Sequence, residues 1–256
     1  MITGGGSGLG RAAAKLLAHA GAKVAILGRT QSELQAVAAE INGSGETTGE
    51  AFAISGDVTD MDSLCSAVAA VEQRWGRLDT VFANAGVNGT WTGIDDLDEA
   101  DFESTIDINL TGTFRTVKAV VPAMRRAGGG SITITSSVNG TRMFSNTGAS
   151  AYAASKAGQV ALARMLAVEL ASDRIRVNCI CPGAIHSEID DNTERENLAS
   201  LRPAVEFPEG QIPLTGKEPG TAGQVAELVW FLSSDASTHT TGTEVYIDGA
   251  QSLFQG

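Results

Sequence analysis

The chain has 256 residues, of which 43% are hydrophobic and 19% charged, enough for one large α/β domain or two small ones. Its formal net charge of −12 argues against a nucleic-acid-binding surface, which needs clustered Lys and Arg. No apolar run reaches membrane-spanning length, no signal peptide is recognisable, and three cysteines cannot form a full disulfide set. We therefore expect a cytoplasmic protein with neither a nucleic acid nor a membrane as partner.

Strand-like apolar runs alternate with amphipathic segments along the whole chain. The expected strands are 23–27, 51–54, 79–83, 131–135, 174–180 and 243–247. The expected helices are 10–20, 31–41, 60–75, 99–126, 151–171 and 221–233. This alternation predicts an α/β fold with a single Rossmann-type, doubly wound parallel sheet and helices on both faces. No linker or repeat interrupts the pattern, so we expect one domain over residues 1–256.

A glycine-rich loop opens the chain in "TGGGSGLGR" (3–11), where Gly4, Gly8 and Gly10 have the spacing G-x3-G-x-G. The strand before it is only the stub "MIT", so either that strand is very short or residues precede Met1. A flexible turn would also explain glycines alone, but here strand, loop and helix follow in the order that a dinucleotide site requires. The predicted phosphate contacts are Gly4, Ser7, Gly8, Leu9 and the following helix N-terminus.

The end of the second strand reads "ILGRT" and carries Arg29 where a carboxylate would bind the adenosine ribose in an NAD site. A guanidinium would bind a 2′-phosphate, so Arg29 favours NADP(H) over NAD(H), although NAD(H) stays possible. The alternative is a surface arginine that stacks on the adenine.

A metal site is not expected. Cys179 and Cys181 share one face of the strand in "IRVNCICPG", but two further ligands would be needed and the three histidines are scattered. Buried core cysteines are the simpler interpretation.

Tyr152 and Lys156 lie four residues apart in "AYAASKAG" and therefore on one face of a helix. A core aromatic and a surface lysine would be the plain alternative. The pairing of a phenol with an ammonium instead suggests proton transfer. At about 5 Å the ammonium would lower the phenol pKa by roughly 2 units if it acted alone, with desolvation opposing it.

Seven motifs occur together in order: "TGGGSGLG", "GDV" (56–58), "NAG" (84–86), "INL" (108–110), "TSSV" (135–138), "YAASK" (152–156) and "NCICPG" (178–183). With these motifs the chain resembles the short-chain dehydrogenase/reductase family over essentially its whole length. The resemblance implies an NAD(P)-dependent oxidoreductase that interconverts a carbonyl and an alcohol.

The resemblance also implies a catalytic set of Asn109, Ser137, Tyr152 and Lys156. Tyr152 would be the general acid and base, and Ser137 would hydrogen-bond the same substrate oxygen. Lys156 would also hold the cofactor ribose, and Asn109 would bind a water that links Lys156 to solvent.

Further cofactor contacts follow from the same resemblance. Asp57 and Val58 would flank the adenine, and the 84–86 motif would line the cofactor. The segment from Pro182 to Ser187 would run beside the nicotinamide, with Ser187 standing where the family usually has Thr. Besides the glycine loop and Arg29, the cofactor contacts that the resemblance implies are Asp57, Val58, Asn84, Ala85, Gly86, Tyr152, Lys156, Pro182, Gly183, Ile185 and Ser187.

Two departures from the family pattern concern the catalytic loop. The tandem Ser136–Ser137 leaves a choice, and Ser137 is preferred because it directly precedes Val138. The Ser137–Tyr152 gap is longer than usual, with the extra residues in "NGTRMFSNTGA". We expect this insertion to reshape the substrate pocket more than the catalytic geometry.

The substrate is a small carbonyl or alcohol whose identity the sequence leaves open. Trp91, Met143, Phe144 and a loop or lid at 184–220 suggest an apolar or mixed pocket. Within it, 186–207 is expected to be helical, with the inward positions Ile189, Leu198, Leu201 and Val205.

Two helices, 116–124 and 151–171, are apolar on more than one side, and the resemblance implies a homodimer or homotetramer. Two alternatives stay open: an NAD-dependent sugar or polyol dehydrogenase on the same fold, and a non-catalytic dinucleotide sensor or scaffold. A P-loop enzyme is excluded because no Gly-Lys-Ser/Thr follows the glycines.

Overall fold

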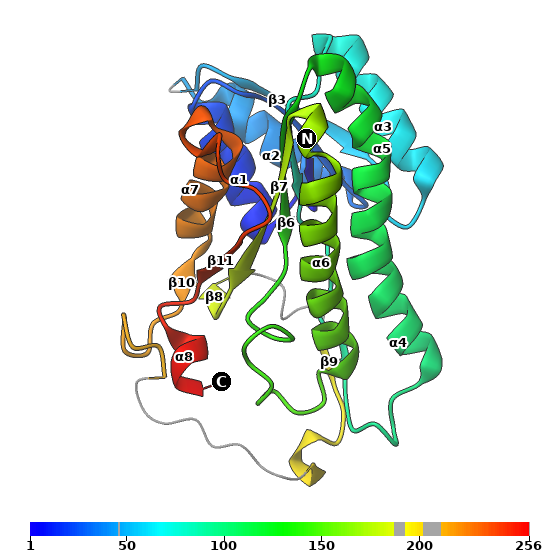
Figure 1. Ribbon diagram of the computed structural model, residues 1–256, viewed down its shortest axis with the longest axis vertical. Coiled ribbons are helices and arrows are strands. Elements are labelled where there is room, and N and C mark those ends of the chain that lie inside the picture. The colour runs from blue at the N-terminus through cyan, green and yellow to red at the C-terminus, as the bar shows by residue number, and fades with distance from the viewer. Residues whose placement is uncertain (46, 187–192, 202–210, 256) are drawn as a thin grey trace.

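A seven-stranded parallel sheet forms the centre of the molecule (Figure 1). The computed structural model describes residues 1–45, 47–186, 193–201 and 211–255. The strand order is β11-β7-β6-β4-β1-β2-β3, and every neighbouring pair is parallel. The strands are β1 (Ile2–Thr3), β2 (Lys23–Gly28), β3 (Glu50–Ser55), β4 (Thr80–Ala83), β6 (Gly130–Thr135), β7 (Ile175–Pro182) and β11 (Glu244–Ile247).

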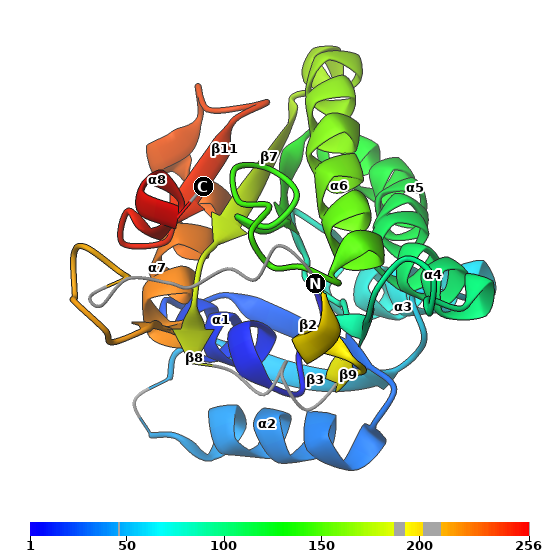
Figure 2. The same ribbon diagram turned by 90° about the horizontal axis from the view of Figure 1, so that it is seen from below.

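Helices cover both faces of this sheet, as Figure 2 shows from below. One face carries α1 (Gly8–His19), α2 (Gln31–Gly43) and α7 (Ala222–Ser233). The other carries α3 (Met61–Trp75), α5 (Gly112–Ala127) and α6 (Ser150–Glu169). The doubly wound α/β sandwich expected from the sequence is therefore confirmed. Strand order reverses between β1 and β4, and a ligand crevice is expected at the carboxyl ends of strands at such a point.

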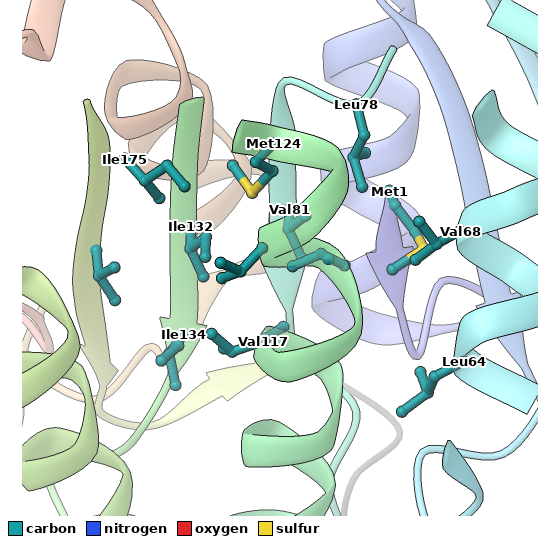
Figure 3. Packing of buried hydrophobic residues seen from close by; sticks show 14 of the residues in the cluster. Met1, Leu64, Val68, Leu78, Val81, Val117, Met124, Ile132, Ile134 and Ile175 are labelled. Atoms are coloured by element: carbon teal, nitrogen blue, oxygen red, sulfur yellow. The ribbon is translucent and has the colours of Figure 1, made fainter. Parts of the chain in front are cut away.

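Two hydrophobic clusters fix the helices to the sheet. Figure 3 shows the first, in which Ile132 and Ile134 of β6 lie beside Val117 and Met124 of α5. Their fractional exposure is 0 to 3%. This burial explains the continuous apolar runs of the strands, because helices on both faces of a parallel sheet leave neither face exposed to solvent.

Smaller elements differ from the sequence-based expectation. The expected helix 99–126 is α4 (Glu99–Ile106) and α5 joined by a π-helical turn at Asp107–Thr111. Two short parallel pairs were not predicted: β5 (Gly89–Trp91) with β9 (Thr193–Arg195), and β8 (Ile185–His186) with β10 (Gly220–Thr221). A last helix, α8 (Gln251–Gln255), and 3-10 turns at Ala171–Asp173, Leu198–Ser200 and Asp235–Ser237 complete the described elements.

The expected lid helix over 186–207 is wrong for residues 193–195, which form a strand. Their backbone pairs with Gly89–Trp91, and the Asn88 side-chain amide donates to the Thr193 hydroxyl at 2.7 Å, so distant partners outweigh local helical propensity. Leu198 and Leu201 do turn inward, against Gly148 and Gly93. Ile189 and Val205 lie outside the described residues.

The amino end of β1 lies between β2 and β4. The Met1 nitrogen donates to the Thr80 carbonyl at 2.8 Å. A cavity of about 520 Å³ opens beside it, and the residues that line it include Lys23, Trp75 and Trp230. None of the predicted site residues lines this cavity. Among the described helices, none is long and apolar enough to cross a membrane.

We predict that Ile132→Ala lowers the free energy of unfolding by about 2–5 kcal/mol, because the removed atoms leave a cavity in the buried sheet. The matched variant is Ile94→Ala, at a side chain that is 76% exposed, and it should change stability by no more than about 0.5 kcal/mol. Urea unfolding of both variants measures the difference. Equal effects would contradict the packing described here.

Candidate active site

The glycine loop leaves room for a ligand at the start of α1. Gly4 and Gly8 have φ values of +66° and +48°, which side-chain-bearing residues rarely adopt. A Cβ on Gly10 would lie 2.1 Å from the Gly4 carbonyl oxygen, so the loop and helix pack as closely as only glycine allows. The N-cap residue Ser7 makes no side-chain cap bond. The helix N-terminus can therefore accept an anion such as a pyrophosphate, and the loop fits a dinucleotide.

Asn84 links the carboxyl ends of three neighbouring strands. The Thr3 hydroxyl on β1 accepts bonds from the backbone N–H groups of Asn84 and Ala85, each at 3.0 Å. The Asn84 amide donates to the Thr3 carbonyl at 3.2 Å, and the Thr135 hydroxyl donates to the Asn84 Oδ1 atom at 3.1 Å. These bonds fix the floor of the crevice between β1, β4 and β6.

Two cavities of about 340 and 180 Å³ meet along this edge and share Gly4, Ala85 and Gly86. The first also contains Arg29, Asp57 and Val58. The second contains, of the predicted residues, Ser7, Gly8, Leu9, Asn84, Ser137, Tyr152, Lys156, Pro182, Gly183 and Ile185. Every predicted cofactor-contact residue within the described part of the chain thus lines one of the two cavities. Ser187 lies outside the described residues.

The first cavity carries opposed charges. Burial alone would raise the pKa of Asp57, but hydrogen bonds from Thr59, helped by the positive charges of Arg29 and Arg115, hold it below its ordinary value. The Thr59 N–H donates to the Asp57 carboxylate at 2.9 Å. Asp57 is therefore an anion that faces the same space as the Arg29 guanidinium.

Helix α6 places Tyr152 and Lys156 in the second cavity, although only 7% and 3% of these residues is exposed. The Lys156 Nζ donates to the Thr135 carbonyl at 3.0 Å and lies 5.4 Å from the centre of the Tyr152 ring. Ser137 follows the end of β6 and hydrogen-bonds the Tyr152 side chain. A hydroxyl, a phenol and an amine thus converge at one point.

The pKa values of the pair differ from the sequence-based expectation. Burial raises the pKa of the Tyr152 phenol, and the Ser137 hydrogen bond opposes that rise only in part. Burial also lowers the pKa of Lys156 to about 8. Desolvation therefore outweighs the attraction between phenol and ammonium in the protein alone, because both groups have left water.

The two serines of the tandem face different partners. The Ser136 hydroxyl donates to the Lys156 backbone carbonyl at 2.8 Å and so joins β6 to α6. Ser137 is the one that bonds Tyr152, and its hydroxyl also accepts the Asn139 N–H at 3.1 Å. This geometry supports the choice of Ser137 as the residue that meets the substrate oxygen.

Asn109 lies in the π-helical turn and is fully buried. Its side chain accepts from the Val87 N–H at 2.8 Å and donates to the Val87 carbonyl and the Ser155 hydroxyl, at 2.9 and 3.0 Å. These bonds hold the loop after β4 against α6. Asn109 lines neither cavity, so the expected water-binding role is not visible in its side-chain contacts.

Sequence reasoning missed three residues whose hydrogen bonds position the site residues. Thr135 gives its carbonyl to Lys156, Thr3 positions Asn84, and the Gln251 amide oxygen accepts the Ala184 N–H at 2.8 Å. The first two are polar residues at the carboxyl end of an apolar strand, which is a recognisable signal. Gln251 has no comparable signal, because its partner is 67 residues away.

The open side of Tyr152 is bounded by Trp91, whose ring centre lies 6.3 Å from that of the phenol. The guanidinium carbon of Arg195, on β9, lies 5.6 Å from the centre of the Trp91 ring. Met143, Phe144 and Leu201 line a neighbouring cavity of about 360 Å³ beside the first turn of α6. The insertion and the lid therefore meet next to the catalytic helix, while His186 is exposed.

Cys179 and Cys181 are both fully buried in β7, as expected, and burial raises the pKa of Cys181 to about 11 and that of Cys179 further still. Cys65 is exposed. Within the described ranges, no group of three or more His, Cys, Asp or Glu residues could hold a metal ion.

Comparisons with known proteins show which family the chain is similar to. Residues 1–198 match the family described as short chain dehydrogenase. Levodione reductase of Leifsonia aquatica is 37% identical over 98% of this chain and 93% of its own length. A 3-ketoacyl-ACP reductase structure from Sinorhizobium meliloti 1021 is 47% identical, covers 99% of both chains and has a TM-score of 0.93. The 3-ketoacyl-(acyl-carrier-protein) reductase of Brucella melitensis, solved with NADH, is 26% identical, with a TM-score of 0.85 over 98% of this chain and 96% of its own.

The low pKa of Lys156 predicts a pH-dependent stability. Between about pH 8, its folded value, and about pH 10, near its unfolded value, the unfolded chain binds a proton that the folded chain does not. The contribution of Lys156 to the free energy of unfolding is therefore lowest below pH 8, and it rises with pH across that window. We expect the stability of the wild type relative to Lys156→Met to increase by roughly 2 kcal/mol from about pH 8 to about pH 10 in urea unfolding.

The matched control for this measurement is Lys118→Met, at an exposed lysine on α5. Its stability difference from the wild type should stay flat over the same pH range. A flat profile for Lys156→Met as well would show that the amine titrates normally and is not desolvated.

Proposed function

The chain belongs to the short-chain dehydrogenase/reductase family, and on that premise we propose that it interconverts a carbonyl and an alcohol with a bound nicotinamide dinucleotide. The observation that carries the proposal is the convergence of Ser137, Tyr152 and Lys156 in a cavity that begins at the glycine loop. A non-catalytic dinucleotide sensor would have no need of a buried phenol and amine at that point.

The residues of this chain would bind and orient the reactants and move the proton. The cofactor supplies or accepts the hydride when bound. Tyr152 gives its proton to the substrate oxygen during reduction and takes one back during alcohol oxidation. Ser137 donates a hydrogen bond to the same oxygen and stabilises its developing charge. Because both groups are buried, this electrostatic help is stronger than it would be in water.

Lys156 would hold the cofactor ribose and favour the anionic form of Tyr152. Its Nζ already donates to the Thr135 carbonyl, which leaves further N–H donors for a ribose hydroxyl. Asn109 would keep the loop after β4 in place, since its side chain bonds Val87 twice. A water bound at Asn109 would link Lys156 to solvent.

NADP(H) is the preferred cofactor in this proposal, because Arg29 lines the cavity that would take the adenosine end and a guanidinium matches a phosphate. NAD(H) remains a usable cofactor, as Asp57 faces the same cavity and a related reductase was solved with NADH. The enzyme would act on a small carbonyl or alcohol and not on a nucleic acid or a membrane.

The substrate would be apolar or mixed in character, given Trp91 beside Tyr152 and the cavity lined by Met143, Phe144 and Leu201. The names of the relatives offer two classes: cyclic ketones, from levodione reductase, and 3-ketoacyl thioesters, from the 3-ketoacyl-ACP reductases. The net charge of −12 argues against an acidic carrier protein. A panel of ketones, sugars and keto-esters, read by loss of NADPH absorbance, separates these classes and the polyol alternative.

A homodimer or homotetramer is also proposed. Met165 and Val168 of α6 are 70% and 80% exposed, and Phe114 of the neighbouring α5 is 45% exposed. Large apolar side chains on adjacent helices are costly to leave in water, and a second copy would cover them.

Tyr152→Phe tests the proposed chemistry. Turnover should fall roughly 100- to 10,000-fold, because the variant has no proton to transfer, while NADPH binding by fluorescence should persist. The control is Tyr246→Phe, which removes the other tyrosine hydroxyl, bonded to Glu244. Near-normal turnover of Tyr152→Phe would reject its role.

Val168→Glu combined with Met165→Glu tests the proposed assembly. Burying two carboxylates is unfavourable, so sedimentation velocity should show a smaller species than the wild type. Ile94→Glu, at an exposed side chain on a loop, is the control and should leave the size unchanged. A wild type that sediments as a monomer would contradict the assembly.

A further inference from the structure

The first turn of α2 brings a carboxylate against the glycine loop. A Cβ placed on Gly6 would lie 3.1 Å from the Glu33 Oε2 atom and 3.3 Å from the Glu33 Cβ atom, so the side chain of Glu33 covers Gly6. Gly6 stands between Gly4, which lines both cavities of the site, and Ser7, which lines the second. Gly6 and Glu33 line neither cavity themselves, so the carboxylate lies beside the glycine loop, next to the loop residues that do line them.

The position of Glu33 is fixed by its neighbour in the helix. Leu34 is 1% exposed, and its methyl groups pack on the loop and on the strand end: they lie 3.7 Å from the Cβ position of Gly6 and 3.4 Å from that of Gly28. A buried leucine in contact with both segments holds the first turn of α2 in place. Glu33 is thus carried to Gly6 by packing and not by an ion pair.

Glu33 differs in this respect from the other glutamate of the same helix. Glu40 is bound by Arg11 and Lys15 in two ion pairs. For Glu33, no hydrogen bond or ion pair is made within the described residues. Its charge is consequently not neutralised by a side chain of the described residues, and it stands beside the backbone of Gly6.

Arg29 and Glu33 bracket the same edge with opposite charges. Arg29 directly follows β2 and lines the first cavity, and Glu33 follows four residues later, after the helix begins. In dinucleotide sites the end of the second strand contacts the adenosine ribose, where a carboxylate accepts the 2′-hydroxyl and an arginine accepts a 2′-phosphate. This chain places one group of each kind there.

We propose that Glu33 is a specificity-determining residue that limits the preference for NADP(H) by accepting a ribose hydroxyl of NAD(H) and opposing the 2′-phosphate. The inference rests on the proposed function, because it needs a dinucleotide in this crevice. A solvent-exposed carboxylate close to a dianionic phosphate would change its binding by roughly tenfold. Glu33 and Arg29 together would make the protein accept both cofactors.

The experiment measures dissociation constants of NADPH and NADH by fluorescence for the wild type and three variants. Glu33→Gln should raise the preference for NADPH by roughly fivefold to tenfold, through tighter NADPH and weaker NADH binding. Arg29→Ala should shift the preference toward NADH. Glu227→Gln, at an exposed glutamate on α7 that is not among the atoms beside Gly6, is the charge-matched control and should leave the ratio unchanged.

Adenosine 2′-monophosphate and adenosine 5′-monophosphate, used as competitors, separate the phosphate effect from any change at the nicotinamide end. Glu33→Gln should improve binding of the 2′-phosphate only. A ratio that stays within twofold in Glu33→Gln while Arg29→Ala moves it overturns the role of Glu33 and leaves the proposed function standing. A wild type that binds neither dinucleotide overturns the proposed function and the inference with it.

Discussion

The buried amine of Lys156 is the constraint around which the site is arranged. An ammonium that is 3% exposed must find acceptors, and the Thr135 carbonyl at the end of β6 supplies one at 3.0 Å. That bond joins α6 to the sheet. A second bond between the same elements runs from the Ser136 hydroxyl, which donates to the Lys156 backbone carbonyl. The same burial raises the pKa of the Tyr152 phenol and lowers that of the Lys156 amine, so in the protein alone it favours the neutral form of both groups.

The cofactor crevice depends on a different constraint, the close approach of backbones at the carboxyl edge of the sheet. Gly10 has no space for a Cβ, and Asn84 bonds across from β4 to both β1 and β6. The Asn84 side chain, which would be costly to bury unpaired, is thereby bonded on both sides. Arg29 and Asp57 then bring charges of both signs to the first cavity, and Glu33 adds a carboxylate beside Gly6. The residues proposed for proton transfer and those proposed for cofactor choice thus belong to different strand ends.

Much of the fold followed from local pattern, and the failures share one cause. The six strand runs and the helices between them were predicted within a few residues, because continuous apolar runs and helical periodicity are local signals. The β5–β9 pair was missed because Gly89–Trp91 and Thr193–Arg195 become strands only by meeting each other across about a hundred residues. The π-helical turn at Asn109 was also hidden, since its side-chain bonds to Val87 and Ser155 are tertiary.

The sequence alone determined the chemistry available: a glycine loop, an arginine after the second strand, and a phenol four residues from an amine. Spacing of this kind predicts which side chains share a face, because helices and strands have a fixed local repeat. Only the tertiary structure decided how those groups behave. It directed the Ser136 hydroxyl to the Lys156 carbonyl, raised the Tyr152 pKa and lowered the Lys156 pKa by burial, and brought Glu33 to Gly6 by the packing of Leu34. Desolvation and long-range packing depend on which surfaces meet, and a linear pattern does not contain that information.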